Sequence, residues 1–177
     1  MRWPRRPFRR GFARAQDGAV AIEFAFVAIP LFFIVFSILE VALYFTIDSV
    51  LDNAVIETGR LIRTGQASAQ GMTPEQFKAR LCSRMSVFAD DCVTRATIDV
   101  QVIPTFAMPV DPLEDGMLEP GEATGYSNGS PRALMLVRVW YRQPLFTAFL
   151  AKGLSRPKDE PGTYLLSAST AFRNEPP

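Results

Sequence analysis

Two acidic residues lie inside the long apolar run near the start of the chain, and one of them follows a glycine at a suggestive spacing. The run extends from Ala19 to Ile47 and is interrupted by Glu23 and Glu40. A carboxylate among apolar side chains is costly unless a positive group pairs with it. A cut after Gly18 would give Ala19 a new α-amino group and make Glu23 the fifth residue. The pattern therefore predicts a processing site, and a carboxylate that pairs with such an amino group on a neighbouring subunit.

The apolar run itself predicts a membrane-spanning helix. A helix rises about 1.5 Å per residue, so roughly 20 apolar residues cross a hydrocarbon core of about 30 Å. The stretch from Phe24 to Leu39 carries no charge. The head before it holds one acid, Asp17, and six arginines, namely Arg2, Arg5, Arg6, Arg9, Arg10 and Arg14. This bias predicts a cytoplasmic N-terminus, with everything after about Asp48 on the other side of the membrane.

A basic head followed by an apolar run is also typical of export signals and of simple membrane anchors. A cleaved signal peptide has an apolar core of roughly 7 to 15 residues followed by small residues, whereas this run is longer and ends in Tyr44, Phe45 and Thr46. The pair Arg5-Arg6 resembles a twin-arginine signal, but paired arginines arise by chance in so basic a head. An uncleaved signal anchor remains open, because Glu23 lies near the membrane edge and its side chain can reach the interface.

The residues around Gly18 resemble a known processing site. The stretch from Gly18 to Phe24 reads Gly-Ala-Val-Ala-Ile-Glu-Phe, and it is similar to the site in small pilins and pseudopilins of tight-adherence (Tad) pili, where glycine precedes four residues, a glutamate and an aromatic residue. In one departure, Phe24 stands where those pilins usually carry tyrosine. It keeps the ring and loses the hydroxyl group.

The resemblance extends to the TadE-like family of Tad pilus assembly proteins. It covers about a quarter of the chain, through the stretches 17–31, 38–40, 53–54 and 58–60. Weaker similarity to longer members of the family is found in Val137-Arg138-Val139-Trp140-Tyr141 with Pro144-Leu145, and in the ending Phe172-Arg173-Asn174-Glu175-Pro176.

The resemblance implies a minor pseudopilin or assembly protein of a Tad-type (type IVc) pilus. It would be a single-pass protein of the bacterial inner membrane, with a periplasmic C-terminal domain, and it would be cut at Gly18-Ala19 by the prepilin peptidase. The expected partners are other pilin or pseudopilin subunits, inner-membrane pilus assembly proteins, the peptidase and the lipid bilayer. Glu23 and Glu40 are the expected assembly residues of the membrane helix, although Glu40 also suits a marker of the far interface. No cofactor is expected.

Two other function classes compete with the pseudopilin hypothesis. The first is an uncleaved, membrane-anchored periplasmic scaffold of the pilus secretion machine. The second is an anchored enzyme or receptor that uses a long proline-containing loop between Pro104 and Pro131. The absence of recognisable catalytic residues disfavours this last class.

The domain organisation follows from changes in pattern along the chain. We expect a basic leader over residues 1–18, a transmembrane helix over 19–47, an amphipathic stalk that continues this helix over 48–65, and a periplasmic domain over 66–177. The stalk is predicted from apolar side chains at three- and four-residue spacing. Its apolar face comprises Val50, Leu51, Ala54, Val55, Thr58, Leu61 and Ile62.

The two cysteines, Cys82 and Cys92, are predicted to form a disulfide. Thiols on the outer side of a bacterial inner membrane are oxidised, and the chain has no histidine to accompany them in a zinc site. They fall on and just after a second helix, whose start is indicated by Thr73-Pro74-Glu75-Gln76. We expect this helix to run to about Val87, after a linker over residues 66–71.

The remaining elements predict an α+β fold. Ile98, Val100 and Val102 alternate with polar residues, as in a half-buried strand. The stretches 132–141 and 163–172 predict two further strands, and 145–154 predicts a short helix between them. The expected fold is a long N-terminal helix, a shorter second helix and a small three-stranded antiparallel sheet, an arrangement like that of type IV pilins.

Two motifs in the proline-containing loop suggest other chemistry. Gly125-Tyr126-Ser127-Asn128-Gly129 fits a serine nucleophile pattern, but that motif needs a histidine base, and we interpret it as an Asn-Gly turn. Acids between Asp111 and Glu122 fall at some positions of a calcium loop, although Leu113 occupies a ligand position. An ordinary solvated acidic loop is the favoured interpretation, so no metal site is predicted. Beyond the leader the chain is net acidic, which argues against a nucleic-acid partner.

Overall fold

The computed structural model describes residues 17–106, 113–114, 117–118, 125–155 and 161–176. The helices in these ranges are α1 (Asp17–Arg63), α2 (Gln66–Ala69), α3 (Pro74–Ser83), the 3-10 helix η2 (Ser86–Phe88), α4 (Ala89–Arg95) and α5 (Ala148–Leu154). The strands are β1 (Ala96–Val102), β2 (Leu113–Glu114), β3 (Met117–Leu118), β4 (Leu134–Pro144) and β5 (Thr163–Arg173). The chain divides into two units, Met1–Ile38 and Leu39–Pro177.

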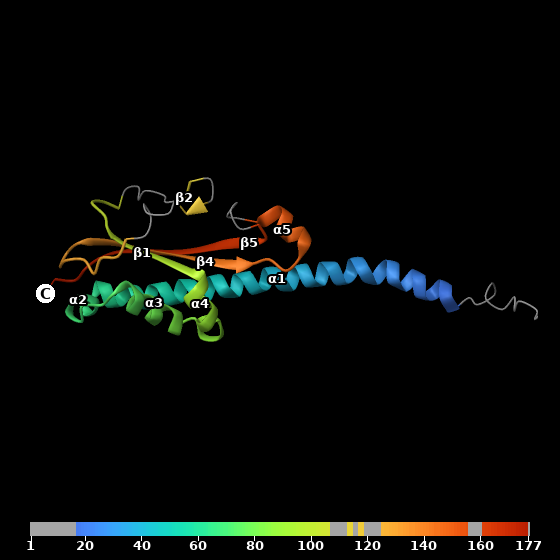
Figure 1. The fold of residues 1–177 in the computed structure, drawn as a ribbon, viewed down its shortest axis with the longest axis horizontal. Coiled ribbons are helices and arrows are strands. Elements are labelled where there is room, and N and C mark those ends of the chain that lie inside the picture. Colours follow the sequence, from blue (N-terminus) through green and yellow to red (C-terminus); the bar gives the residue numbers. More distant parts are fainter. Residues whose placement is uncertain (1–16, 107–112, 115–116, 119–124, 156–160, 177) are drawn as a thin grey trace, which may run out of the picture. The chain divides into compact units, whose positions relative to one another are not determined.

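The second unit is built on an antiparallel three-stranded sheet in the order β1-β4-β5 (Figure 1). Alternate side chains of each strand point to one face of the sheet, and on the inner face they meet apolar residues of α1, α3 and α4. The largest fully buried side chains of this core are Ile47, Leu51, Ile62, Phe77, Leu81, Met85, Met135 and Tyr141. The α+β class and the three strands predicted from the sequence are confirmed.

Helix α1 ends at Arg63, two residues before the expected end of the stalk. Gly65 adopts a left-handed conformation with φ of 73°, which a residue without a Cβ atom accepts readily. Its N–H donates to the carbonyl of Ile62 at 3.0 Å, so one of the last helical carbonyls is satisfied. The segment after it differs from the expected linker, because residues 66–69 form the single-turn helix α2 with Ala67 buried.

Helix α3 begins with the predicted capping box. The Thr73 Oγ1 atom accepts from the Gln76 N–H at 3.3 Å, and the Gln76 side chain accepts in return from the Thr73 N–H at 3.1 Å. The expected end near Val87 is wrong, because α3 stops at Ser83. Shortly afterwards Ser86 takes a positive φ of 53°, which lies outside the right-handed α region, so α3 does not continue through it.

The break in the helix between α3 and α4 allows the two cysteines to approach each other. Cys82 on α3 and Cys92 on α4 form a disulfide with their Cα atoms 5.4 Å apart, and both side chains are buried. Cys92 therefore lies on a helix of its own. The predicted disulfide is confirmed, and it joins α3 and α4 into a covalently closed pair.

Replacing both cysteines, Cys82→Ala with Cys92→Ala, should lower the free energy of unfolding by about 3 kcal/mol, since the short loop is no longer closed in the unfolded chain. Urea unfolding of the full chain in detergent micelles, with and without the substitutions, measures the difference. In the unreduced, denatured wild-type protein a thiol reagent should label neither cysteine. Labelling of both would contradict the disulfide.

Candidate functional site

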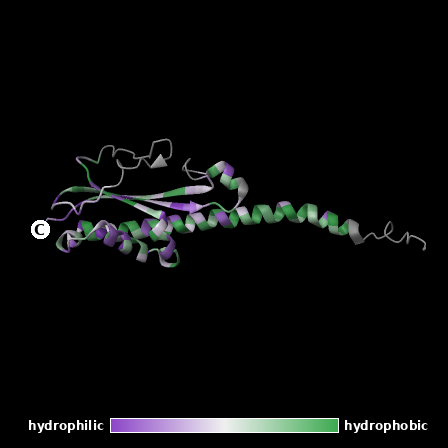
Figure 2. Cartoon of the chain, in the orientation of Figure 1, coloured by the Kyte–Doolittle hydropathy of each residue, from purple (hydrophilic) through white to green (hydrophobic). Residues whose placement is uncertain are grey.

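The first part of α1 exposes nearly all of its apolar surface. From Val20 to Leu39 every side chain is exposed except Ala28 and Ser37, which are partly covered. In Figure 2 the ribbon of this stretch has the colour of hydrophobic residues along most of its length. Its most exposed large side chains are Phe26, Ile29, Phe24, Val20 and Val27. An exposed apolar surface of this extent marks a site that lipid or another protein covers.

The length of this exposed run suits a bilayer. Twenty residues at about 1.5 Å per residue give about 30 Å, the thickness of a hydrocarbon core. Among the described residues, α1 is the one helix long and apolar enough to cross a membrane. The side chains that face outward in this stretch have no polar groups that would oppose such a placement, apart from Ser37 and Glu23. Ser37 donates to the carbonyl of Phe33 at 2.9 Å.

Glu23 is the acid of this exposed run. Its side chain is exposed, six residues after the helix begins at Asp17. Within the described part of the chain no hydrogen bond or ion pair involves its carboxylate. Gly18 and Ala19, the other residues of the predicted processing site, lie in the first turn of α1, and Phe24 is exposed next to Glu23. The described part of the chain thus leaves the Glu23 carboxylate exposed, and its expected pairing stays a prediction.

Glu40 has a different environment, because it is buried to 5% exposure and bonded within its own chain. Its carboxylate accepts hydrogen bonds from the Tyr44 hydroxyl group and from the backbone N–H groups of Phe146 and Thr147, the last at 2.8 Å. These bonds tie α1 to the segment that leads from β4 into α5. The burial of Glu40 needs no second subunit, and its expected role in helix assembly stays a prediction.

The exposed run and both acids fall inside the segment that comparison with known proteins identifies. Residues 18–60 match the family model of TadE-like proteins. No curated protein and no solved structure matches the chain. The match confirms the resemblance predicted from the sequence and supports a role in Tad pilus assembly, and this family is one of structural and assembly proteins.

The second half of the TadE-like segment packs against the sheet. Ala54 and Thr58 of α1 are buried. Gly59 lies under β5, where an added Cβ atom would be 3.2 Å from both the Phe172 ring and the Thr170 side chain. Such contacts are tighter than a side chain normally accepts, so glycine permits the close approach of helix and strand. These residues of the TadE-like segment therefore serve the fold.

The C-terminal residues noted in the sequence also hold the folded unit together. The Asn174 side chain donates to the carbonyls of Asn128 and Ser130 at 3.4 and 3.2 Å. The Glu175 N–H donates to the carbonyl of Arg63 at 2.9 Å, at the end of α1. The last strand is thus fastened both to the helix end and to the segment before β4.

A buried ion pair, which the sequence analysis missed, lies on the outer face of the sheet. The fully buried Asp99 on β1 faces Arg138 on β4, and one carboxylate oxygen accepts from the Arg138 Nε and Nη2 atoms at 3.1 and 2.9 Å. The other oxygen accepts from the Gly125 N–H at 3.0 Å and the Gln101 amide at 2.7 Å. The pair fastens the segment at Gly125 to the edge of the sheet, so its role is structural.

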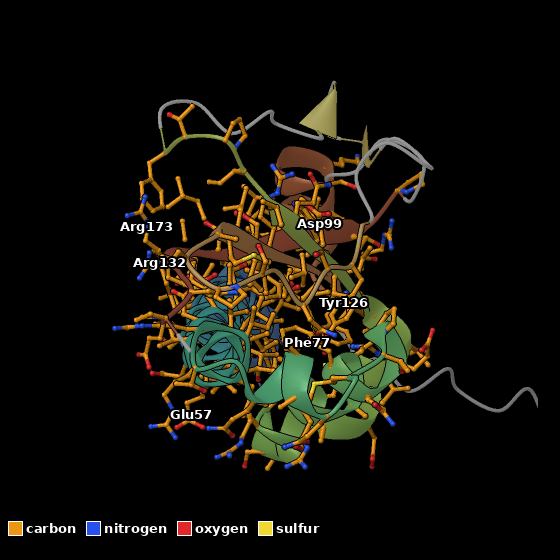
Figure 3. All side chains as sticks on the ribbon, turned by 90° about the vertical axis from the view of Figure 1, so that its left-hand side faces the viewer. Glu57, Phe77, Asp99, Tyr126, Arg132 and Arg173 are labelled. Carbon is orange, nitrogen blue, oxygen red and sulfur yellow. A yellow bond between two sulfur atoms is a disulfide. The ribbon has the colours of Figure 1, made fainter. Side chains whose placement is uncertain are left out.

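The serine motif has no catalytic arrangement. The Ser127 hydroxyl oxygen accepts from the Gly129 N–H at 3.1 Å, and the Tyr126 hydroxyl group donates to Asn128 at 2.7 Å. Burial raises the pKa of Tyr126 to about 12, so this hydroxyl group stays protonated at neutral pH. Figure 3 shows Tyr126 beside Phe77, and the two ring centroids are 5.6 Å apart. The motif thus contributes packing and internal hydrogen bonds.

The calcium hypothesis falls mostly outside the described residues. Of the stretch from Asp111 to Glu122, only the backbones of β2 and β3 are described, and they pair as a short antiparallel ladder. Elsewhere in the described ranges no cluster of three metal-ligating side chains is found. The leader, apart from Asp17 and Gly18, also lies outside the described residues.

Removing the Glu40 carboxylate should destabilise the junction between α1 and α5. In the Glu40→Ala variant the Phe146 and Thr147 N–H groups lose their acceptor, so we expect a loss of roughly 1 to 3 kcal/mol in the free energy of unfolding. Glu40→Gln keeps one acceptor oxygen and should lose less. Urea unfolding of the full chain in detergent micelles measures both, and hydrogen exchange at residues 145–154 should rise.

A matched control is Glu57→Ala on the same helix. Glu57 pairs with Arg84 at 2.8 Å, but both side chains are more than half exposed, so its removal should change stability by about 0.5 kcal/mol or less. Figure 3 shows Glu57 at the surface, away from the sheet. Equal effects of the Glu40 and Glu57 substitutions would show that the buried contacts contribute nothing.

Proposed function

We propose that this chain is a minor pseudopilin or assembly protein of a Tad-type pilus, processed by the prepilin peptidase after Gly18. The observation that carries the proposal is that three features occur within a few residues of one another. The family match begins at Gly18, the apolar run of the sequence begins at Ala19, and an exposed acid follows at the fifth position of the processed chain. A membrane anchor alone requires only the second of these.

The exposed run explains how such a subunit assembles. Before assembly, lipid covers the apolar side chains of residues 20–39. In an assembled pilus, the corresponding helices of neighbouring subunits replace the lipid, because their surfaces are equally apolar. The carboxylate of Glu23 then pairs with the α-amino group of Ala19 on a neighbouring subunit, which compensates for its removal from water. Glu40 contributes to assembly indirectly, by holding α5 against α1 just beyond the exposed run.

The folded unit belongs on the periplasmic side in this proposal. The arginine-rich head favours a cytoplasmic N-terminus in the inner membrane. The disulfide between Cys82 and Cys92 agrees with this orientation, because disulfides persist in oxidising compartments. Residues 66–177 then lie outside the membrane, where we expect them to cap or prime the fibre in an arrangement like that of type IV pilins.

The second candidate is an uncleaved anchored scaffold of the secretion machine. Phe24 favours it, because this residue lacks the hydroxyl group of the tyrosine usual at that position in the family's processing site. The two candidates share the membrane topology and the TadE-like segment. They differ in the N-terminus of the mature protein and in the partner of Glu23.

The mature N-terminus distinguishes the two candidates. In cells that contain the prepilin peptidase we expect the purified protein to begin at Ala19, and in cells without it at Met1, as determined by mass spectrometry of the intact chain. Gly18→Leu should leave Met1 as the first residue even in the strain that contains the peptidase. An unprocessed Met1 in the strain with active peptidase would sink the processing claim and leave the scaffold.

Removing the charge of Glu23 should impair assembly without impairing the cut. Glu23→Gln keeps the size of the side chain and loses the ion pair, so crosslinking to other pilus subunits in cells should fall several-fold while Ala19 remains the first residue. The control is Glu57→Gln, an exposed acid of the same helix beyond the apolar run. Wild-type crosslinking of the Glu23 variant would contradict the proposed pairing.

A further inference from the structure

Three large apolar side chains are exposed close to the Glu40 junction. Phe45 on α1 is 69% exposed, Phe146 before α5 is 72% exposed, and Leu154 at the end of α5 is 40% exposed. We call these three residues the collar. All of them belong to the folded unit, whose other large side chains mostly fill the core.

The contacts of the folded unit group the collar residues at one end of it. Phe45 and Leu154 line the same hollow of about 240 Å³, together with Tyr44 and Tyr164. Tyr44 donates to Glu40, and the Phe146 N–H donates to the same carboxylate. The three collar residues therefore lie near the part of α1 that carries Glu40 and Tyr44.

The position of Glu40 in the chain places this end of the unit at a membrane boundary. Leu39 is the last residue of the exposed apolar run, and Glu40 follows it directly as a buried, hydrogen-bonded acid. A run of about 20 residues fills the hydrocarbon core of a bilayer. When it does so, Glu40 reaches the level of the headgroups, and its hydrogen bonds hold Phe146 and Thr147 at that same level.

The side chains at this level suit a lipid surface. Aromatic and large aliphatic side chains partition into the boundary between headgroups and acyl chains, and lysines favour the phosphates above it. Helix α5, whose sequence is Ala-Phe-Leu-Ala-Lys-Gly-Leu, carries an exposed Lys152 and no acid. Asp48 is the acid that lines the hollow. It lies on α1, farther from the apolar run than Phe45 does.

We propose that the collar enters the outer interface of the bilayer and binds the folded unit to the membrane surface. Phe45, Phe146 and Leu154 contact the upper acyl chains, and Lys152 contacts lipid phosphates. The partner is the lipid surface itself, continuous with the lipid around residues 20–39. This proposal requires the membrane-spanning helix, but neither processing nor pilus assembly.

A single added thiol tests the depth of the collar. Both natural cysteines are in the disulfide, so Phe146→Cys provides a unique thiol for an environment-sensitive fluorophore in the unreduced full chain. The protein is reconstituted at low density in vesicles of phosphatidylethanolamine and phosphatidylglycerol. We expect the label to be quenched several-fold more by phospholipids with a nitroxide high on the acyl chain than by iodide present on both sides of the bilayer.

The matched control is Val87→Cys on η2, another apolar side chain that is 84% exposed and lies outside the collar. Its label should show the opposite preference, for iodide. Phe45→Cys, on a different element, should behave like Phe146→Cys, so that the test does not depend on one substitution. All three positions are exposed, so their replacement leaves the core intact.

Two results would overturn the proposal. Iodide quenching of the labels at 45 and 146 equal to that at 87 would place the collar in water. Protection from iodide that develops only at high protein density, without quenching by the nitroxide lipids, would show that a second copy of the chain covers the collar. Neither result would bear on the cut after Gly18, which is measured in cells.

Discussion

A single continuous helix, α1, has an exposed apolar part and a part that packs against the sheet. The rest of the structure depends on where along the helix the first part ends and the second begins. Up to Leu39 the helix offers apolar side chains that its own chain leaves exposed, and from Glu40 onward it buries one face against the sheet. A carboxylate is costly in hydrocarbon, but here two backbone N–H groups and a tyrosine hydroxyl group satisfy it. The change of environment is therefore confined to a few residues.

The TadE-like segment combines two physical roles that a family match alone does not separate. In the part of the chain that the structure describes, the side chains of its first half are exposed or only partly covered, so they are constrained by whatever surrounds them. Its second half is constrained by the close approach of α1 and β5 at Gly59 and by the buried Thr58. Residues of one family segment thus meet two different requirements, an exposed apolar surface in the first half and packing against a sheet in the second.

The elements that could be predicted from the sequence are those with a local signal. The apolar run, the capping box at Thr73 and the alternation along β1 each depend on residues a few positions apart, and the disulfide followed from the compartment. The two backbone partners of Glu40 could not be predicted, because Phe146 and Thr147 are 106 and 107 positions away. The sequence does not indicate that Asp99 and Arg138 pair, because their pairing depends on the register between β1 and β4. The end of α3 at Ser83 and the positive φ of Ser86 shortly after it have no signal in the sequence.

The disulfide has a consequence for the order of export and folding of the chain. The bond joins α3 to α4, and it forms only where thiols are oxidised. On the proposed topology the helical pair reaches that compartment after the domain has crossed the membrane. The chain in the cytoplasm thus lacks one of the constraints that complete its fold, which keeps it easier to unfold during export. Oxidation then makes the folded state harder to reverse once the domain has arrived.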